Sequence, residues 1–370
     1  MRIVLTGGGT GGHIVPLITV AKKMKEKVGA SDDLEFLFIG PAGELEIEMM
    51  GRVGIPIKKI LVGKMRRYFA LQNFVDCLKI PLGFVQALWH LLVFMPDAVF
   101  SKGGYASLGV VLAAWIYRIP ILIHESDSVP GMTNDFLGKF STRVAVSYEE
   151  AEKDFPAAQV VLTGNPIRED IAQGDAQKAR EMFSLLESKK VIFVYGGSQG
   201  AQIINDKLIN ILPKLLHKYQ VIHQTGKNNY EAVTRKAGEL GIKAGTDGYH
   251  PVAFIGEELK DILAVADLII TRAGANSLAE VAANEKPAIV VPLEGSANNH
   301  QKKNAYAIAH WGGCMVLEES NLGENIFVSR IEEIMNDENL QKKLGENIKR
   351  FYHPDAIDKI ADGILGMIKE

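Results

Sequence analysis

The sequence predicts an α/β protein made of two parallel-sheet domains. Short apolar runs rich in β-branched residues alternate with stretches long enough for crossover helices, which is the pattern of a parallel sheet. Two of these runs, residues 3–5 and 191–195, lead directly into glycine-rich turns, so both halves of the chain begin in the same way. A length of 370 residues with 47% hydrophobic content is sufficient for two cores.

Each half supplies a series of expected strands. In the first half they cover residues 3–5, 34–39, 98–100, 121–123, 143–146 and 160–162, and in the second half 191–195, 221–223, 252–255, 268–270 and 288–291. The segment Gly164-Asn165-Pro166 separates the two series. We therefore expect an N-terminal domain over residues 1–164 and a C-terminal domain over 165–349. The helical segment 350–370 is expected to pack back on the first domain.

Composition excludes several classes of protein. A formal net charge of −3 provides no field for a polyanion, so we expect no nucleic-acid partner. The two cysteines, Cys77 and Cys314, lie in different halves and indicate neither a disulfide framework nor a metal site. The apolar run at residues 3–5 is too short for a signal peptide, which favours a cytoplasmic protein.

The first glycine-rich turn, Gly-Gly-Gly-Thr-Gly-Gly-His at residues 7–13, follows a strand and opens a helix. Backbone N–H groups and the positive end of a helix dipole favour an anion there, so a phosphate-bearing ligand is expected. The second strand ends in Ile39-Gly40 without the acidic residue that a dinucleotide-binding site needs, which disfavours a hydride-transfer enzyme. The helix dipole favours a neutral His13 that can accept a proton; the alternative is a capping histidine.

Two segments of the second half carry polar groups after expected strands. Glu280 lies on an alanine-rich helix after the 268–270 strand, where it could accept hydrogen bonds from a ribose or simply be solvated. The amide-rich loop at residues 292–301 follows the 288–291 strand, at the edge where open α/β sheets bind ligands. Its amides suit sugar hydroxyls, although an ordinary surface loop has the same composition.

Residues 64–94 combine cations, aromatics and a long apolar stretch. The apolar part, residues 80–94, is shorter than the ~20 residues of a spanning helix, so no transmembrane segment is expected. Arg66, Arg67 and Phe69 precede it, as in surfaces that touch anionic lipid. A buried helix beside a solvated basic turn is the alternative.

Seven ordered motifs resemble the MurG family, and together they cover nearly the whole chain. They lie at residues 7–13, 101–105, 124–126, 164–168, 196–201, 272–274 and 300–305. The resemblance implies a GT-B architecture, in which two Rossmann-like domains face a cleft. It also implies a glycosyltransferase that moves N-acetylglucosamine (GlcNAc) from UDP-GlcNAc to lipid I, giving lipid II in peptidoglycan synthesis, and thereby a role in cell-wall biogenesis, cell shape and cell division.

The same resemblance implies roles for individual residues. On the donor side, Arg168 and Ser198 contact UDP-GlcNAc, and the backbone of Ile255 meets the uracil. Glu280 accepts hydrogen bonds from the ribose hydroxyls, and Gln301 recognises the hydroxyls of the sugar. The segment under the diphosphate comprises Ala275, Asn276, Ser277, Leu278, Ala279 and Glu280.

On the acceptor side, Thr10, Gly11 and Gly12 line the cleft near the sugar. The sequence departs from the family pattern at Asp127, where many members have Asn after His-Glu-Gln. Asp127 could therefore act as a base rather than as an amide donor.

Glycosyl transfer of this kind needs no cofactor and, in this chain, no expected metal. Negative charge that develops on the leaving UDP can be stabilised by a helix N-terminus, and the chain has no Asp-x-Asp pair. We expect inversion at the anomeric carbon. His13 is the first candidate for the general base, with Glu125 and Asp127 as alternatives.

A polyprenyl-linked acceptor stays in the bilayer, so the resemblance favours membrane contact through residues 64–94 and a peripheral location on the cytoplasmic face of the bacterial inner membrane. Three rival functions from other classes remain open: a UDP-sugar epimerase of similar fold, a dehydrogenase that binds NADH, and a non-catalytic UDP-GlcNAc sensor. Among glycosyltransferases, a relative with another hexose donor or lipid acceptor is the nearest alternative.

Overall fold

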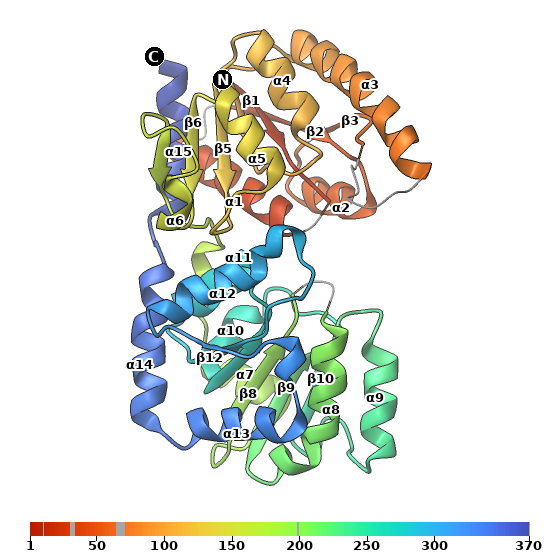
Figure 1. The fold of residues 1–370 in the computed structure, drawn as a ribbon, viewed down its shortest axis with the longest axis vertical. Coiled ribbons are helices and arrows are strands. Elements are labelled where there is room, and N and C mark those ends of the chain that lie inside the picture. Colours follow the sequence, from red (N-terminus) through yellow and green to blue (C-terminus); the bar gives the residue numbers. More distant parts are fainter. Residues whose placement is uncertain (10, 30–33, 64–70, 198–199, 370) are drawn as a thin grey trace. The chain divides into compact units, whose positions relative to one another are not determined.

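The computed structural model describes residues 1–9, 11–29, 34–63, 71–197 and 200–369. The chain divides into two compact units (Figure 1). Unit 1 comprises Met1–Arg168 together with His353–Glu370, and unit 2 comprises Glu169–Tyr352. Each unit is built on a parallel β-sheet of its own, as the sequence predicts.

Unit 1 holds a seven-stranded sheet of order β3-β2-β1-β4-β5-β6-β7, in which every neighbouring pair is parallel. The strands are β1 (Arg2–Thr6), β2 (Glu35–Gly40), β3 (Ile57–Lys59), β4 (Ala98–Ser101), β5 (Ile121–Glu125), β6 (Arg143–Val146) and β7 (Val160–Leu162). The helices are α1 (Gly11–Val28), α2 (Glu44–Arg52), α3 (Leu71–Phe94), α4 (Leu108–Ile116), α5 (Met132–Leu137), α6 (Glu149–Glu152) and α15 (Ala356–Lys369), with a short 3-10 turn at Gly138–Phe140. The strand order reverses between β1 and β4, where open sheets bind their ligands.

Successive residues of the central strand β1 enter opposite cores. Ile3 and Leu5 pack on the side covered by α1 and α15, whereas Val4 packs on the side covered by α3 and α4. This alternation follows from the two-residue period of a strand, and it requires helices on both faces. Unit 1 is therefore a three-layer structure in which helices cover both faces of the sheet. Ligand binding and catalysis are left to the loops at the ends of the strands.

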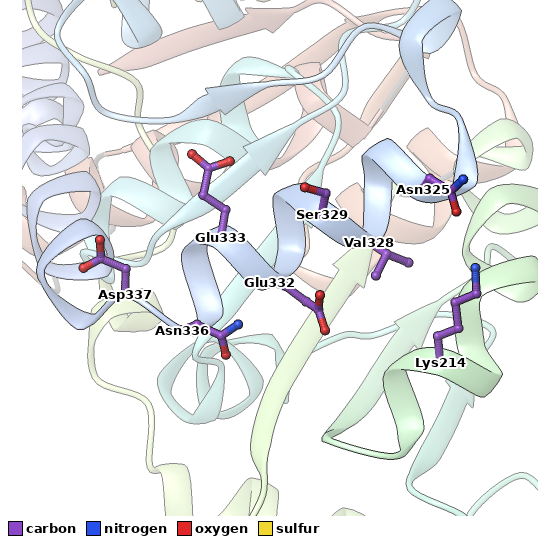
Figure 2. A pocket seen from close by; sticks show the side chains of 8 residues that line it. All are labelled: Lys214, Asn325, Val328, Ser329, Glu332, Glu333, Asn336 and Asp337. Carbon is purple, nitrogen blue, oxygen red and sulfur yellow. The ribbon is translucent and has the colours of Figure 1, made fainter.

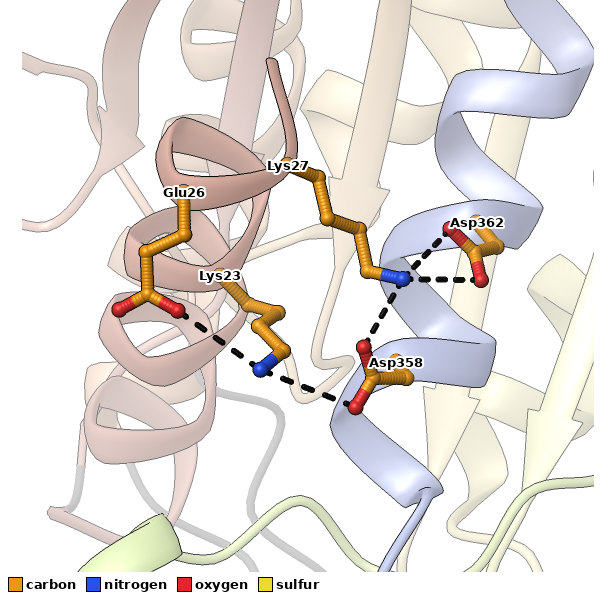
Figure 3. A network of polar contacts seen from close by, with 5 residues as sticks. All are labelled: Lys23, Glu26, Lys27, Asp358 and Asp362. Carbon is orange, nitrogen blue, oxygen red and sulfur yellow. Dashed lines mark hydrogen bonds and ion pairs between the residues drawn. The ribbon is translucent and has the colours of Figure 1, made fainter. Parts of the chain in front are cut away.

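The C-terminal helix α15 packs on α1 in unit 1. Ile360 and Ile364 are fully buried in the core that also contains Ile14 and Leu17 of α1. At the rim of this contact, Lys27 forms ion pairs of 2.8 Å with Asp358 and 2.9 Å with Asp362 (Figure 3). Because these side chains are partly exposed to solvent, apolar burial and not ion pairing holds the helix in place.

Unit 2 holds a six-stranded parallel sheet of order β10-β9-β8-β11-β12-β13. The strands are β8 (Lys190–Tyr195), β9 (Tyr219–Gln224), β10 (Tyr249–Val252), β11 (Leu268–Thr271), β12 (Ala288–Val290) and β13 (Met315–Val316). The helices are α7 (Ala176–Phe183), α8 (Gln202–Leu216), α9 (Tyr230–Glu239), α10 (Leu259–Val265), α11 (Ala275–Ala283), α12 (His300–His310), α13 (Glu324–Met335) and α14 (Glu338–Ile348). Short 3-10 turns occur at Glu169–Ala172, Ala297–Asn299, Glu319–Asn321 and Lys349–Phe351.

One expected strand was misplaced. Residues 252–255 were predicted as a strand, but β10 ends at Val252 and the chain then leaves the sheet. The N–H of Ile255 donates to the side chain of Gln224 at 3.2 Å instead of to a neighbouring strand. β10 lies at the edge of the sheet, where only one side of the strand is paired, so local apolar content does not fix its end.

The apolar stretch at residues 80–94 forms most of α3, a helix that contains Pro81. Among the described residues, no helix combines the length and the apolar character needed to cross a bilayer.

Candidate functional site

The loops after β1, β4 and β5 meet at the carboxyl edge of the unit 1 sheet. Gly9 has φ of +88°, and a Cβ atom there would lie 3.3 Å from the Tyr105 hydroxyl. Its N–H donates to the carboxylate of Glu46 on α2 at 2.9 Å. The glycine loop is thus held tightly between the 101–105 segment and α2, and only glycine fits this backbone.

His13 lies in the first turn of α1, directly after this loop. Its Nδ1–H donates to the carbonyl of Gly8 at 2.8 Å, which leaves Nε2 as the unprotonated nitrogen. Burial lowers the pKa of His13; the hydrogen bond to Gly8 and the charge of Asp127 oppose this effect, and the charge of Lys102 adds to it. The imidazole is therefore neutral at pH 7 and can accept a proton on Nε2.

Glu125 ends β5 and organises the loop that follows it. Oε1 accepts the N–H of Asp127 at 2.9 Å, and Oε2 accepts from the N–H of Gly131 at 3.1 Å and from Nδ2 of Asn134 at 2.9 Å. Burial raises the pKa of Glu125 to about 7, and the Asp127 charge acts in the same direction. Both carboxylate oxygens are used as acceptors, so the structure brings Glu125 to the site as a loop anchor.

Lys102 also belongs to this edge, although no local pattern in the sequence indicates a role for it. It directly follows β4, is only 2% exposed, and its Nζ lies 2.5 Å from His124 Nδ1 and 2.8 Å from Ser126 Oγ. The signal in the sequence was a lysine placed immediately after an apolar strand, where burial was predictable but a partner was not.

In unit 2, α11 begins directly after the loop that follows β11. Gly274 caps the helix, and Ala275, Asn276 and Ser277 form its first turn. The first N–H groups of a helix have no acceptor within it, and the dipole adds positive potential, so this turn suits a diphosphate. Leu278 and Ala279 are buried, which places them under this turn as support.

Glu280 lies one turn further along α11 and is half-buried. The hydroxyl of Tyr195, the last residue of β8, donates to the Ser277 carbonyl at 3.1 Å and lies 3.5 Å from Glu280 Oε2. Burial raises the pKa of Tyr195 well above its ordinary value, so it remains a hydrogen-bond donor at all working pH values. Tyr195 thereby joins β8 to the carboxylate expected to hold a ribose.

Ile255 and Gln301, two further residues expected to contact the donor, form hydrogen bonds within unit 2. Gln224 accepts from Ile255 N–H and donates to Gly197 O at 2.9 Å, so it ties Ile255 to the glycine-rich turn after β8. Gln301 lies in the first turn of α12, and its Oε1 accepts the N–H of Leu293 at 3.0 Å.

A buried ion pair braces the amide-rich loop that carries Gln301. Arg272 Nη1 lies 2.5 Å from Glu319 Oε1 and also donates to Val291 O at 3.2 Å. Glu319 accepts the N–H of Glu294 in turn, at 3.2 Å. The sequence pointed to Arg272 only as part of a motif; its partner is 47 positions away and could not be identified from spacing.

Some expected site residues lie outside the described part of the chain, and the structure does not test them: Thr10, Ser198, Arg66, Arg67 and Phe69. Gly11 and Gly12 begin α1, next to His13. Arg168 is half-buried at the end of the first segment of unit 1. Within the described ranges, no group of three or more His, Cys, Asp or Glu side chains is arranged to hold a metal ion.

The surface of unit 2 also has an open hollow of about 610 Å³ (Figure 2). It is lined by Lys214 of α8 and by residues on and after α13, among them Glu332, Glu333 and Asp337. It contains none of the expected site residues, and its carboxylates are unsuited to a phosphate-bearing ligand.

Comparison with known proteins gives the family. Residues 3–146 match the glycosyltransferase family 28 N-terminal domain and residues 191–360 match the glycosyltransferase family 28 C-terminal domain. A UDP-N-acetylglucosamine–N-acetylmuramyl-(pentapeptide) pyrophosphoryl-undecaprenol N-acetylglucosamine transferase of Bacillus anthracis is 34% identical over 360 residues, covering 97% of each chain. Its namesake in Clostridium perfringens is 35% identical over 368 residues, covering 99% of this chain and 96% of its own.

Solved structures agree with the GT-B prediction. Acinetobacter baumannii MurG superposes with a TM-score of 0.76 at 25% identity, covering 99% of both chains. A UDP-GlcNAc 2-epimerase from Neisseria meningitidis gives a TM-score of 0.67 at 14% identity over 99% of this chain and all of its own, which shows a shared fold alone. The chain therefore belongs to glycosyltransferase family 28 and, within it, to the MurG family of N-acetylglucosamine transferases.

Proposed function

We propose that this enzyme transfers GlcNAc from UDP-GlcNAc to the 4-hydroxyl of N-acetylmuramic acid in lipid I, giving lipid II and UDP in peptidoglycan synthesis. The observation that carries the proposal is 34–35% identity, over nearly the whole chain, with transferases whose names state both donor and acceptor. The geometry supports it, because each sheet presents at its carboxyl edge a glycine-rich turn and polar groups suited to phosphate and sugar.

On the donor side, the first turn of α11 faces the diphosphate. Glu280 accepts hydrogen bonds from the ribose hydroxyls. The side-chain amide of Gln301, which its loop holds in place, forms hydrogen bonds with the GlcNAc hydroxyls. Ile255 meets the uracil through its backbone, beside the Gln224 side chain that accepts the Ile255 N–H. Arg168 and Ser198 complete the donor contacts.

On the acceptor side, Nε2 of His13 takes the proton from the 4-hydroxyl as its oxygen attacks the anomeric carbon. The bond between that carbon and the diphosphate oxygen breaks, and its electron pair leaves with UDP. Attack from the face opposite the leaving group inverts the configuration. Negative charge grows on the β-phosphate, where the α11 N-terminus stabilises it without a metal.

The roles of the two carboxylates follow from their contacts. Glu125 receives three hydrogen bonds and orders residues 126–131, which makes it a positioning residue. Asp127 contributes negative charge that raises the pKa of His13 and so strengthens it as a base. Thr10, Gly11 and Gly12 bring the backbone close to the acceptor.

An exposed apolar stripe on α3 supports association with the cytoplasmic face of the membrane. Leu78, Leu82, Val85, Trp89 and Leu92 are 54–69% exposed and recur every three or four residues, so they share one face of the helix. α4 packs beside α3 and ends in exposed Trp115 and Ile116 (Figure 1). We propose that this face enters the lipid interface, assisted by Arg66, Arg67 and Phe69.

The decisive experiment incubates the purified protein with labelled UDP-GlcNAc and detergent-dispersed lipid I in the presence of EDTA. Label should move into lipid. Loss of transfer with EDTA would contradict the metal-independent mechanism, and absence of transfer without EDTA, with donor binding intact, would contradict the proposed function.

A parallel incubation without lipid I distinguishes an epimerase, which the shared fold of UDP-GlcNAc 2-epimerases makes the natural rival. Conversion of UDP-GlcNAc to its 2-epimer in that sample would favour the rival. Recovery of unchanged UDP-GlcNAc is expected.

A further inference from the structure

Lys102 joins the two central strands of unit 1 at their carboxyl ends. Its N–H donates to the carbonyl of Thr6, the last residue of β1, at 2.9 Å. A Cβ atom on Gly7 would lie 3.3 Å from Lys102 Cβ, so the lysine lies directly against the glycine loop. The Lys102 side chain is only 2% exposed, so its ammonium has lost most of its hydration. Hydrogen-bond partners are needed to offset the free-energy cost of that desolvation.

The partner atoms define the hydrogen-bond directions. His124 is fully buried, and its Nε2 lies 3.0 Å from the Gly164 carbonyl, so Nε2 carries the proton. Nδ1 is then an acceptor, and it receives a hydrogen from Lys102 Nζ. A second Nζ hydrogen goes to Ser126 Oγ. His124 is consequently neutral, consistent with a pKa that burial and the Lys102 charge place well below its ordinary value.

The charges around Lys102 come from several elements. Burial lowers the pKa of Lys102 to about 7, while the carboxylates of Glu125, at the end of β5, and Asp127, in the loop after it, oppose that effect. Around His13, the Lys102 charge lowers the imidazole pKa and the Asp127 charge raises it. Glu46, on α2, approaches the same loop through the N–H of Gly9.

We propose that Lys102 is a positioning residue for His13: bonded to His124 and Ser126 beneath the glycine loop, its ammonium holds residues 124–127 against the loop whose Gly8 carbonyl orients the His13 imidazole. The proposal rests on the proposed function insofar as His13 is the base. From these positions the two charges act on the His13 imidazole in opposite directions. The Lys102 ammonium extends the pH range over which His13 is a free base, and the Asp127 carboxylate narrows it.

The first test needs no acceptor. The titration of His13 is followed by NMR through its Cε1–H signal, assigned with a His13→Gln variant. In Lys102→Met the His13 pKa should rise by about one unit, because a neighbouring positive charge has been removed. Lys102→Gln removes the charge but retains a donor for His124 Nδ1, so it should show the same shift with a smaller loss of stability.

Lys286→Met is the matched control. Lys286 is another largely buried lysine whose pKa is lowered by burial, and its Nζ donates to Ala264 O at 2.7 Å in unit 2. This variant should leave the His13 titration unchanged. An unshifted His13 in Lys102→Gln would overturn the proposal, as would an equal shift in Lys286→Met.

The second test uses transfer to lipid I. His13 is an active base only at pH values above its pKa. In Lys102→Gln the acid limb of the pH profile of kcat/KM should therefore move up by about one pH unit. At low pH, kcat should change by a larger factor than KM. Lys102→Arg, which keeps the charge, should restore the position of the limb. If the wild-type protein transfers nothing, the proposed function fails, and the NMR titration still decides the role of Lys102.

Discussion

At the scale of single residues, His13 has the protonation state that general-base catalysis requires. Replacing it with Ala should lower kcat by roughly 10²–10⁴-fold, the usual contribution of a positioned base. The Kd for UDP-GlcNAc should stay unchanged, because His13 is not among the proposed donor contacts. Turnover kinetics and calorimetry together check this. Near-normal kcat with unchanged donor affinity would eliminate His13 as the base.

A second residue-scale prediction concerns the pH dependence of stability. His223 is buried between Tyr249 OH and Asn205 Oδ1, each 2.9 Å from a ring nitrogen, and burial lowers its pKa to about 3. In the unfolded chain it protonates near pH 6.5. The unfolded state therefore binds more protons as pH falls from about 6.5 to about 3, and His223 contributes a loss of unfolding free energy of about 1.4 kcal/mol per pH unit in that window.

Urea unfolding of unit 2 at pH 8, 6 and 5 measures this effect. His223→Gln should be less stable than wild type at pH 8, yet lose stability less steeply on acidification. His310→Gln, at an exposed histidine, is the matched control and should retain the wild-type slope. Equal slopes for all three proteins would contradict the assignment.

The identity of chemically active residues could be predicted from the sequence only in part. His13 follows a glycine-rich turn at a strand end, which is a local pattern and predicts its position. Whether Glu125 acts as a base or a loop anchor depends on three donors from other positions of the loop, which no spacing rule reveals. Lys102 and its partners His124 and Ser126 come together only because β4 and β5 are neighbours in the sheet.

At the scale of elements, the central strands were predictable because they are continuous apolar runs buried on both faces. The edge strands β3 and β13 were missed, since they are only three and two residues long and half-buried or exposed. The strand predicted at residues 252–255 was wrong in its position for the same reason, as β10 is an edge strand that contains Pro251. Edge pairing depends on a neighbour more than on the strand's own residues.

The α3 stripe leads to a prediction for the whole helix. Replacing both Leu82 and Trp89 with Glu should abolish most binding to anionic vesicles, because two charges would enter the interface in place of apolar side chains. Transfer to a short-chain, water-soluble acceptor analogue should be retained, since both side chains are exposed and neither belongs to the proposed site.

Vesicle co-sedimentation measures binding. The matched control replaces Leu186 and Leu240 of unit 2, which are 57% and 48% exposed, with Glu, and should bind like wild type. Wild-type binding by the α3 variant would show that another surface meets the membrane. A Phe69→Ala, Arg66→Gln, Arg67→Gln variant tests the residues that precede the helix and should reduce binding as well.

At the scale of the molecule, unit 1 is assembled from both ends of the chain. Ile360, Ala361 and Ile364 of α15 are fully buried in the core formed by β1, β2 and α1, so the first 168 residues leave one face of their sheet partly uncovered. A chain ending at Tyr352 should therefore lose cooperative unfolding of unit 1, with apolar burial, not charge, as the missing contribution. Lys27→Met, which removes the ion pairs of Lys27 with Asp358 and Asp362 in the same contact, should cost no more than about 1 kcal/mol. Hydrogen exchange of β1 and β4 amides separates the two cases: protection should vanish in the truncated chain and persist in Lys27→Met, while unit 2 amides remain protected in both. Persistent protection of β1 without α15 would show that the sheet of unit 1 is complete without the end of the chain.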